Sequence, residues 1–85
     1  MKLLIFTQGD SPETRSAKNL GALLEAEDHD VEYLEADSPE AEQRMELYDV
    51  YSYPTFVVAQ ENGSELECWR GLVPLESDLK HFLNQ

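Results

Sequence analysis

The sequence predicts one α/β domain over residues 1–85, in which four strands form a mixed sheet flanked by three helices in the order βαβαββα. Three observations lead to this fold class. Apolar runs of strand length alternate with segments of helical spacing, two of those segments open on the same tetrapeptide Asp-Ser-Pro-Glu, and an Asn-Gly pair separates the last two strand-like runs. A chain of 85 residues can bury one modest core, and 41% hydrophobic residues are enough to form it.

A change in the spacing of the apolar residues predicts the first strand and the first helix. Residues 2–7, KLLIFT, form a continuous apolar run, which is typical of a strand covered on both faces. From Ser11 onward the apolar residues recur at helical spacing. Members of this stripe are Ala17, Leu20, Leu23 and Leu24. We expect the helix to end in the acidic cluster of residues 25–30, whose carboxylates crowd the end of a helix that prefers cations.

A second strand and helix follow, and then a third strand. Residues 31–36 alternate in polarity as a half-buried strand does. Residues 38–49 predict a short helix with one apolar face, which consists of Ala41, Met45 and Tyr48. Residues 54–59 are β-branched and aromatic and predict the third strand. A strand-helix-strand crossover of this length is almost always right-handed, with its two strands parallel.

The last part of the chain predicts an antiparallel hairpin and a closing helix. The Asn62-Gly63 pair favours a tight turn, so residues 64–71 should return antiparallel to the third strand. We expect the last helix to open at Pro74. Its apolar stripe is Leu75, Leu79, Phe82 and Leu83.

The repeated tetrapeptide occupies residues 10–13 and 37–40. Each copy supplies a serine that can cap a helix, a proline suited to the first helical position and a glutamate for the first turn. Capping alone therefore explains both copies. In the functional alternative, the Ser11 hydroxyl and the free amides of the first turn bind an anion or a thiolate.

The charge balance limits the classes of partner. Six basic and eighteen acidic residues give a formal net charge of -12 and a pI near 4.2. Such a surface repels phosphate backbones and anionic lipid, so we expect no nucleic acid or membrane partner. The acidity fits solubility or a salty cytoplasm, and it also fits a basic partner protein. No apolar run approaches the roughly 20 residues that span a bilayer, and we expect the protein in the cytoplasm.

Cys68 is the only cysteine, so no disulfide can form within the chain, which fits a reducing compartment. We expect it to be a small packed side chain in the fourth strand, with Leu66 and Arg70 on the same face; the alternative is a reactive thiol. We interpret His29 and His81 as ordinary surface residues and not as metal ligands. We therefore expect no metal and no cofactor.

Three stretches of the chain resemble the thioredoxin and glutaredoxin superfamily. Residues 47–65, LYDVYSYPTFVVAQENGSE, are similar to the segment in which a helix is followed by a cis proline that opens a hairpin. Residues 69–83, WRGLVPLESDLKHFL, resemble the closing strand, glycine and amphipathic helix. Residues 3–20, LLIFTQGDSPETRSAKNL, resemble the glutaredoxin opening of strand, Cys-Pro-X-Cys and helix. The resemblance covers essentially the whole chain and implies a minimal thioredoxin-like fold.

In this resemblance the two redox cysteines fall on Ser11 and Thr14, and Pro12 takes the place of the motif proline. An alcohol does not ionise at neutral pH and forms no disulfide, so dithiol oxidoreductase activity is not expected from the sequence Ser11-Pro12-Glu13-Thr14. The resemblance also implies a cis proline at Pro54.

The resemblance implies a binding groove beside the cis proline, where family members pair with an extended peptide or thiol substrate. Its residues in this chain would be Ser11, Pro12, Thr14, Tyr53, Pro54 and Thr55. The favoured interpretation is a redox-inactive thioredoxin-fold protein that binds a peptide or protein partner in this groove. The alternative is a glutathione-dependent or thiol-exchange protein that uses Ser11 or Cys68. Glutathione is disfavoured, because the glycine-aspartate pair that holds its carboxylate in glutaredoxins is replaced here by RGLVPLESD.

Overall fold

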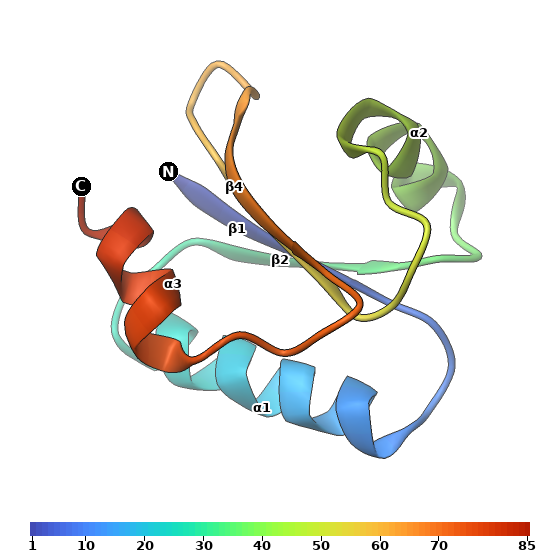
Figure 1. The fold of residues 1–85 in the computed structure, drawn as a ribbon, viewed down its shortest axis with the longest axis horizontal. Coiled ribbons are helices and arrows are strands. Elements are labelled where there is room, and N and C mark those ends of the chain that lie inside the picture. The colour runs from blue at the N-terminus through green and yellow to red at the C-terminus, as the bar shows by residue number, and fades with distance from the viewer.

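The computed structural model describes residues 1–85 as one four-stranded mixed sheet with α1 and α3 on one face and α2 on the other (Figure 1). The elements in chain order are β1 (Lys2–Thr7), α1 (Pro12–Ala26), β2 (Val31–Glu35), α2 (Pro39–Tyr48), β3 (Thr55–Ala59), β4 (Glu65–Arg70) and α3 (Glu76–Leu83). This order and the mixed sheet confirm the fold class that the sequence predicts. None of the helices is long and apolar enough to cross a membrane.

The strand order in the sheet is β2-β1-β3-β4. β1 runs parallel to β2, and β3 runs antiparallel to both β1 and β4. The parallel crossover that the sequence predicts is therefore found between β1 and β2. It is wrong for β2 and β3, because β3 joins the sheet on the other side of β1 in the reverse direction. Phe6 of β1 is opposite Thr55 of β3, which in turn is opposite Arg70 of β4. The end of β1, the start of β3 and the end of β4 therefore meet at one edge of the sheet, where α1 also begins (Figure 1).

Side chains from the two faces of the sheet form two separate cores. The core under α1 and α3 consists of Leu3, Ile5, Ala17, Leu24, Phe56, Val58, Leu79 and Leu83. The core under α2 consists of Leu4, Phe6, Leu34, Ala41, Tyr48, Val50, Val57 and Ala59. Alternate residues of β1 and β3 enter opposite cores, as the period of a strand requires. One short helix, supported by the loop at Val50, covers the second face.

Both copies of the tetrapeptide start helices. The Ser11 hydroxyl accepts the Thr14 amide at 3.1 Å, and the Ser38 hydroxyl accepts the Ala41 amide at 3.3 Å. Each serine has an extended backbone and is followed by proline at the start of the helix. The capping interpretation is confirmed for both copies.

Three details of side-chain placement differ from the sequence prediction. Leu75 is 69% exposed, because the backbone stays extended there and α3 begins only at Glu76. Leu66 packs with the core under α1 and α3, opposite the face of Cys68, because a register shift at Val58 and Ala59 interrupts the alternation of β4.

The third difference lies on α1. Leu23 is 45% exposed, and Gly21 is buried in the helix face that contacts the sheet. A Cβ atom at Gly21 would lie 2.6 Å from the Tyr33 hydroxyl and 2.8 Å from Ile5 Cδ1. The glycine thus makes room for the tyrosine of β2 to lie against the helix.

Candidate functional site

At the start of α1, the hydroxyl groups of Ser11 and Thr14 are hydrogen-bonded to each other. Ser11 is half-buried, whereas Thr14 is 3% exposed. The Ser11 hydroxyl donates to Thr14 Oγ1 at 3.1 Å while it accepts the Thr14 amide. Pro12 between them is exposed. The positions that the sequence equates with the redox cysteines therefore lie in direct contact, with one of them open to solvent.

The loop before β3 holds the other three predicted site residues. The peptide bond between Tyr53 and Pro54 is cis, and Pro54 is buried. The Pro54 carbonyl accepts the Gly71 amide at 2.8 Å, which ties this loop to the one that follows β4. Thr55 is fully buried and its hydroxyl donates to the Ser52 carbonyl at 2.7 Å. These contacts fix the path of the backbone into β3.

The side chain of Tyr53 is anchored against the core under α2, whereas its backbone amide and carbonyl are unpaired. Its hydroxyl donates to Met45 Sδ at 3.0 Å, and its ring packs against the core under α2. The Tyr53 amide and carbonyl have no hydrogen-bond partner within the chain. An extended segment could pair with them in the manner of an added strand.

The helix start with Ser11 and Thr14 and the loop with Tyr53 and Pro54 lie at the same edge of the sheet (Figure 1). α1 begins there, and the loop before β3 turns beside it. Tyr51, which is 81% exposed, and Leu72, which is 49% exposed, belong to the loops at this edge. None of the six predicted site residues lines either of the two cavities of the molecule. The arrangement offers an open surface of backbone groups and exposed side chains, without an enclosed pocket.

Cys68 lies outside this edge. It is half-buried, opposite Val57 in the β3–β4 ladder, with its side chain against the core under α2. Burial raises the pKa of its thiol to about 11; Arg70 opposes this shift, and the carboxylates of Glu65 and Glu67 add to it. The thiol is thus held in its protonated and unreactive form. The described residues contain no cluster of three or more His, Cys, Asp or Glu side chains that could hold a metal ion.

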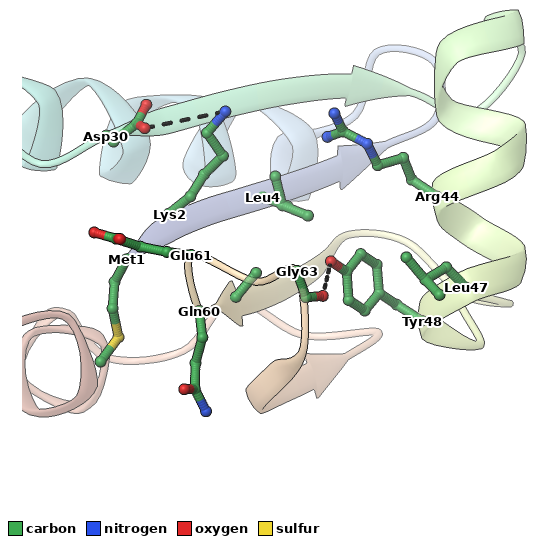
Figure 2. Close-up of a pocket in the computed structure, with 11 residues that line it drawn as sticks. Met1, Lys2, Leu4, Asp30, Arg44, Leu47, Tyr48, Gln60, Glu61 and Gly63 are labelled. Carbon is green, nitrogen blue, oxygen red and sulfur yellow. Dashed lines mark hydrogen bonds and ion pairs between the residues drawn. The ribbon is translucent and has the colours of Figure 1, made fainter.

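A cavity of about 540 Å³ opens between α2 and the amino end of β1, and we call it the α2 pocket (Figure 2). It is lined by Met1, Lys2, Leu4, Asp30, Arg44, Leu47, Tyr48, Ala59, Gln60, Glu61 and Gly63. The Tyr48 hydroxyl donates to the Gly63 carbonyl and joins α2 to the hairpin at its rim. No motif in the sequence marks these residues as a site, because they come from four separate segments.

Comparison with known proteins finds no matching family model and no matching curated protein. Solved structures do match over nearly the whole chain. An uncharacterised thioredoxin-like protein from Clostridium perfringens superposes with a TM-score of 0.81 at 16% identity, over 98% of this chain and 68% of that one. Thioredoxin 1 from Thermosipho africanus gives 0.74 at 14% identity, over 99% and 96% of the two chains. The germline-specific thioredoxin Deadhead from Drosophila melanogaster gives 0.68 at 22% identity, over 98% and 77%.

These similarities establish the fold. The chain has a thioredoxin fold in its minimal form.

Proposed function

We propose that the protein is a redox-inactive thioredoxin-fold module that binds an extended segment of a partner protein at the edge formed by Ser11, Pro12, Thr14, Tyr53, Pro54 and Thr55. The observation that carries the proposal is the unpaired backbone of Tyr53, beside a helix start that has hydroxyl groups in place of thiols. A strand-like segment that pairs with this amide and carbonyl gains main-chain hydrogen bonds without any redox chemistry.

Two further observations support a binding role over a catalytic one. No thiol lies at this edge, and burial raises the pKa of the one cysteine of the chain to about 11, which makes its thiolate rarer still at neutral pH. Tyr51 presents most of its ring to solvent beside the free backbone, and tyrosine contributes large contact area to interfaces at low entropic cost. A reducing cytoplasm, in which a lone thiol stays free, is the compartment that we propose.

A variant that tests binding must leave the packing of the core intact. A Tyr53→Ala variant would remove an anchor that packs under α2, so it would confuse folding with binding. Ser11→Phe instead places a bulky ring on the open surface at the cost of one helix cap. Ser38→Phe is the matched control, because it removes the equivalent cap of α2 at the second copy of the tetrapeptide.

The experiment selects binding peptides from a displayed random library and maps the best of them by amide chemical shifts. We expect shifts at residues 11–14, 51–55 and 71–72, loss of binding in Ser11→Phe and retained binding in Ser38→Phe. Peptides that shift other regions alone, or that bind Ser11→Phe as tightly as the unaltered chain, contradict the proposal.

A further inference from the structure

We propose that the α2 pocket binds a small amphipathic molecule with a single negative charge, of the class of medium-chain carboxylates. The pocket has a volume of about 540 Å³. That size falls within the range of about 300–1,000 Å³ found for ligand sites in proteins. None of the six residues of the peptide-binding edge lines it, so this inference stands apart from the proposed function.

The floor of the pocket is apolar. Leu4 of β1 and Ala59 of β3 form it where the single helix on this face does not cover the sheet, and Tyr48 and Leu47 of α2 form one wall (Figure 2). Leu47 is 67% exposed and belongs to neither of the two cores. A hydrocarbon chain that lies in the pocket would remove this leucine from water, which is the driving force for its entry.

The side of the pocket next to β2 carries two cations. Lys2 Nζ and Arg44 Nη1 both donate to Glu32 Oε1, at 3.2 Å and 3.0 Å. The Glu32 carboxylate therefore holds the Lys2 ammonium and the Arg44 guanidinium close together. Figure 2 shows both on the same side of Leu4. Lys2 has a second and longer ion pair of 4.0 Å with the exposed Asp30.

Arg44 has donors to spare for a ligand. A guanidinium carries five N–H groups. Only Nη1 of Arg44 has an acceptor within the chain. The remaining N–H groups suit a carboxylate, which arginine binds through two parallel hydrogen bonds. The pocket thus joins an apolar floor to two cationic side chains, which are paired with Glu32 and Asp30 and of which Arg44 keeps unpaired donors for an amphipathic anion.

The charge of the whole chain restricts the ligand further. With a formal net charge of -12, the protein repels anions that carry several charges. A single carboxylate meets Lys2 and Arg44 at close range and experiences the least of this repulsion. Glu61 lies on the hairpin at the rim of the pocket and would be the partner of an amine, so a cationic analogue is the informative comparison.

The experiment titrates ¹⁵N-labelled protein with octanoate below its micelle-forming concentration, and in parallel with octylammonium, 1-octanol and inorganic phosphate. We expect octanoate to cause saturable amide shifts at Leu4, Ala59 and Gly63. Octylammonium and 1-octanol should bind more weakly, and phosphate should not bind. Arg44→Gln should weaken octanoate binding about tenfold or more, because it removes a charge-assisted pair of hydrogen bonds.

Two further variants separate the pocket from general effects of charge and folding. Arg15→Gln is the matched control, because the Arg15 guanidinium pairs only with the exposed Asp10, far from the pocket lining, and octanoate affinity should be unchanged. Leu47→Glu adds a negative charge to the wall at an exposed position and should abolish octanoate binding while the unfolding midpoint stays the same. The proposal is overturned by the absence of saturable shifts, by equal affinity for octylammonium or 1-octanol, or by unchanged octanoate affinity in Arg44→Gln or Leu47→Glu.

Discussion

Cys68 is a residue whose chemistry is set by its surroundings. Burial, the largest cause, raises the pKa of its thiol from 9.0 to about 11. At pH 8 the thiolate is then about 100-fold rarer than for a cysteine with an ordinary pKa. We expect iodoacetamide to alkylate the native protein about 100-fold more slowly than the same chain in urea, with a rate that rises with pH until about 11.

Mass spectrometry of samples quenched at intervals measures both rates. The urea sample is the control, because unfolding returns the thiol to water. Equal rates for the native and unfolded chains would show that Cys68 is available as a thiolate, and would bring back the thiol-exchange alternative.

Ser11 and Ser38 make a second prediction at the scale of single residues. Ser38→Ala should lower the free energy of unfolding by about 1 kcal/mol, because it leaves a donor of the first turn of α2 without its cap. Ser11→Ala should have a similar effect on α1. Urea denaturation gives both values. Ser16→Ala is the control, since Ser16 is exposed in the second turn of α1, outside the cap, and its replacement should cause no loss. Unchanged stability in Ser38→Ala would mean that the hydroxyl contributes nothing as a cap.

The sequence predicts these caps because capping is local: the serine, the following proline and the glutamate of the first turn lie next to each other in the chain. The role of Gly21 is not local. It depends on Tyr33, which reaches α1 from β2, and on Ile5 in β1. Spacing along one helix therefore identifies Ala17 and Leu24 and misses the glycine between them.

At the scale of elements, the end of α2 depends on one arginine of β4. The last turn of α2 contains no basic residue. Arg70 of β4 supplies the missing charge, since its Nε donates to the Asp49 carbonyl at 3.0 Å and its Nη2 to the Tyr48 carbonyl at 2.7 Å. The guanidinium thus satisfies carbonyls at the C-terminal end of the helix and links α2 to the sheet.

Arg70→Met should lower the free energy of unfolding by about 1–3 kcal/mol, because two hydrogen bonds to a charged group are lost while most of the length of the side chain is kept. Amide hydrogen exchange in α2 should become faster than in α1. Arg15→Met serves as the control, since its exposed ion pair with Asp10 is worth under about 1 kcal/mol. Similar losses of unfolding free energy in the two variants would show that Arg70 contributes no more than an exposed ion pair does.

The positions of the elements are largely predictable from the sequence, and their pairing details are not. β1 is predicted with its exact bounds, because apolar runs and the glycine that follows are local signals. The bulge that moves Leu66 to the other core depends on how β4 meets β3, which no pattern within one strand records. Leu75 is misplaced for a related reason: its spacing fits the stripe of α3, but the backbone at this position is still extended.

At the scale of the whole molecule, the sheet has one fully covered face and one partly covered face. Two helices cover the first face, and α2 alone covers the second, which leaves the α2 pocket at the amino end of β1. The sequence could indicate the edge that carries Ser11 and Pro54, which we propose as a peptide-binding site, because its residues lie in recognisable stretches. It could not indicate the α2 pocket, whose walls come from the start of β1, the end of β3 with the hairpin that follows, the loop before β2 and the second half of α2.

The two proposed sites are also at different ends of the molecule. Ser11 and Tyr53 follow β1 and precede β3, whereas Lys2 and Ala59 begin β1 and end β3. Ligands of the two sites can therefore bind at the same time, and each site can be altered without the other.

The central claim is that the start of α1 is a thioredoxin-type active-site position that lacks its sulfur. Ser11 Oγ and Thr14 Oγ1 are 3.1 Å apart, so thiols at these positions would be close enough to join. The most direct test compares the unaltered protein with Ser11→Cys, Thr14→Cys in a Cys68→Ala background, in the reduction of insulin disulfides by dithiothreitol. We predict no catalysis by the unaltered protein, and in the variant a disulfide under mild oxidation together with measurable catalysis. A folded variant that forms no disulfide, or an unaltered protein that catalyses the reduction, would contradict the account.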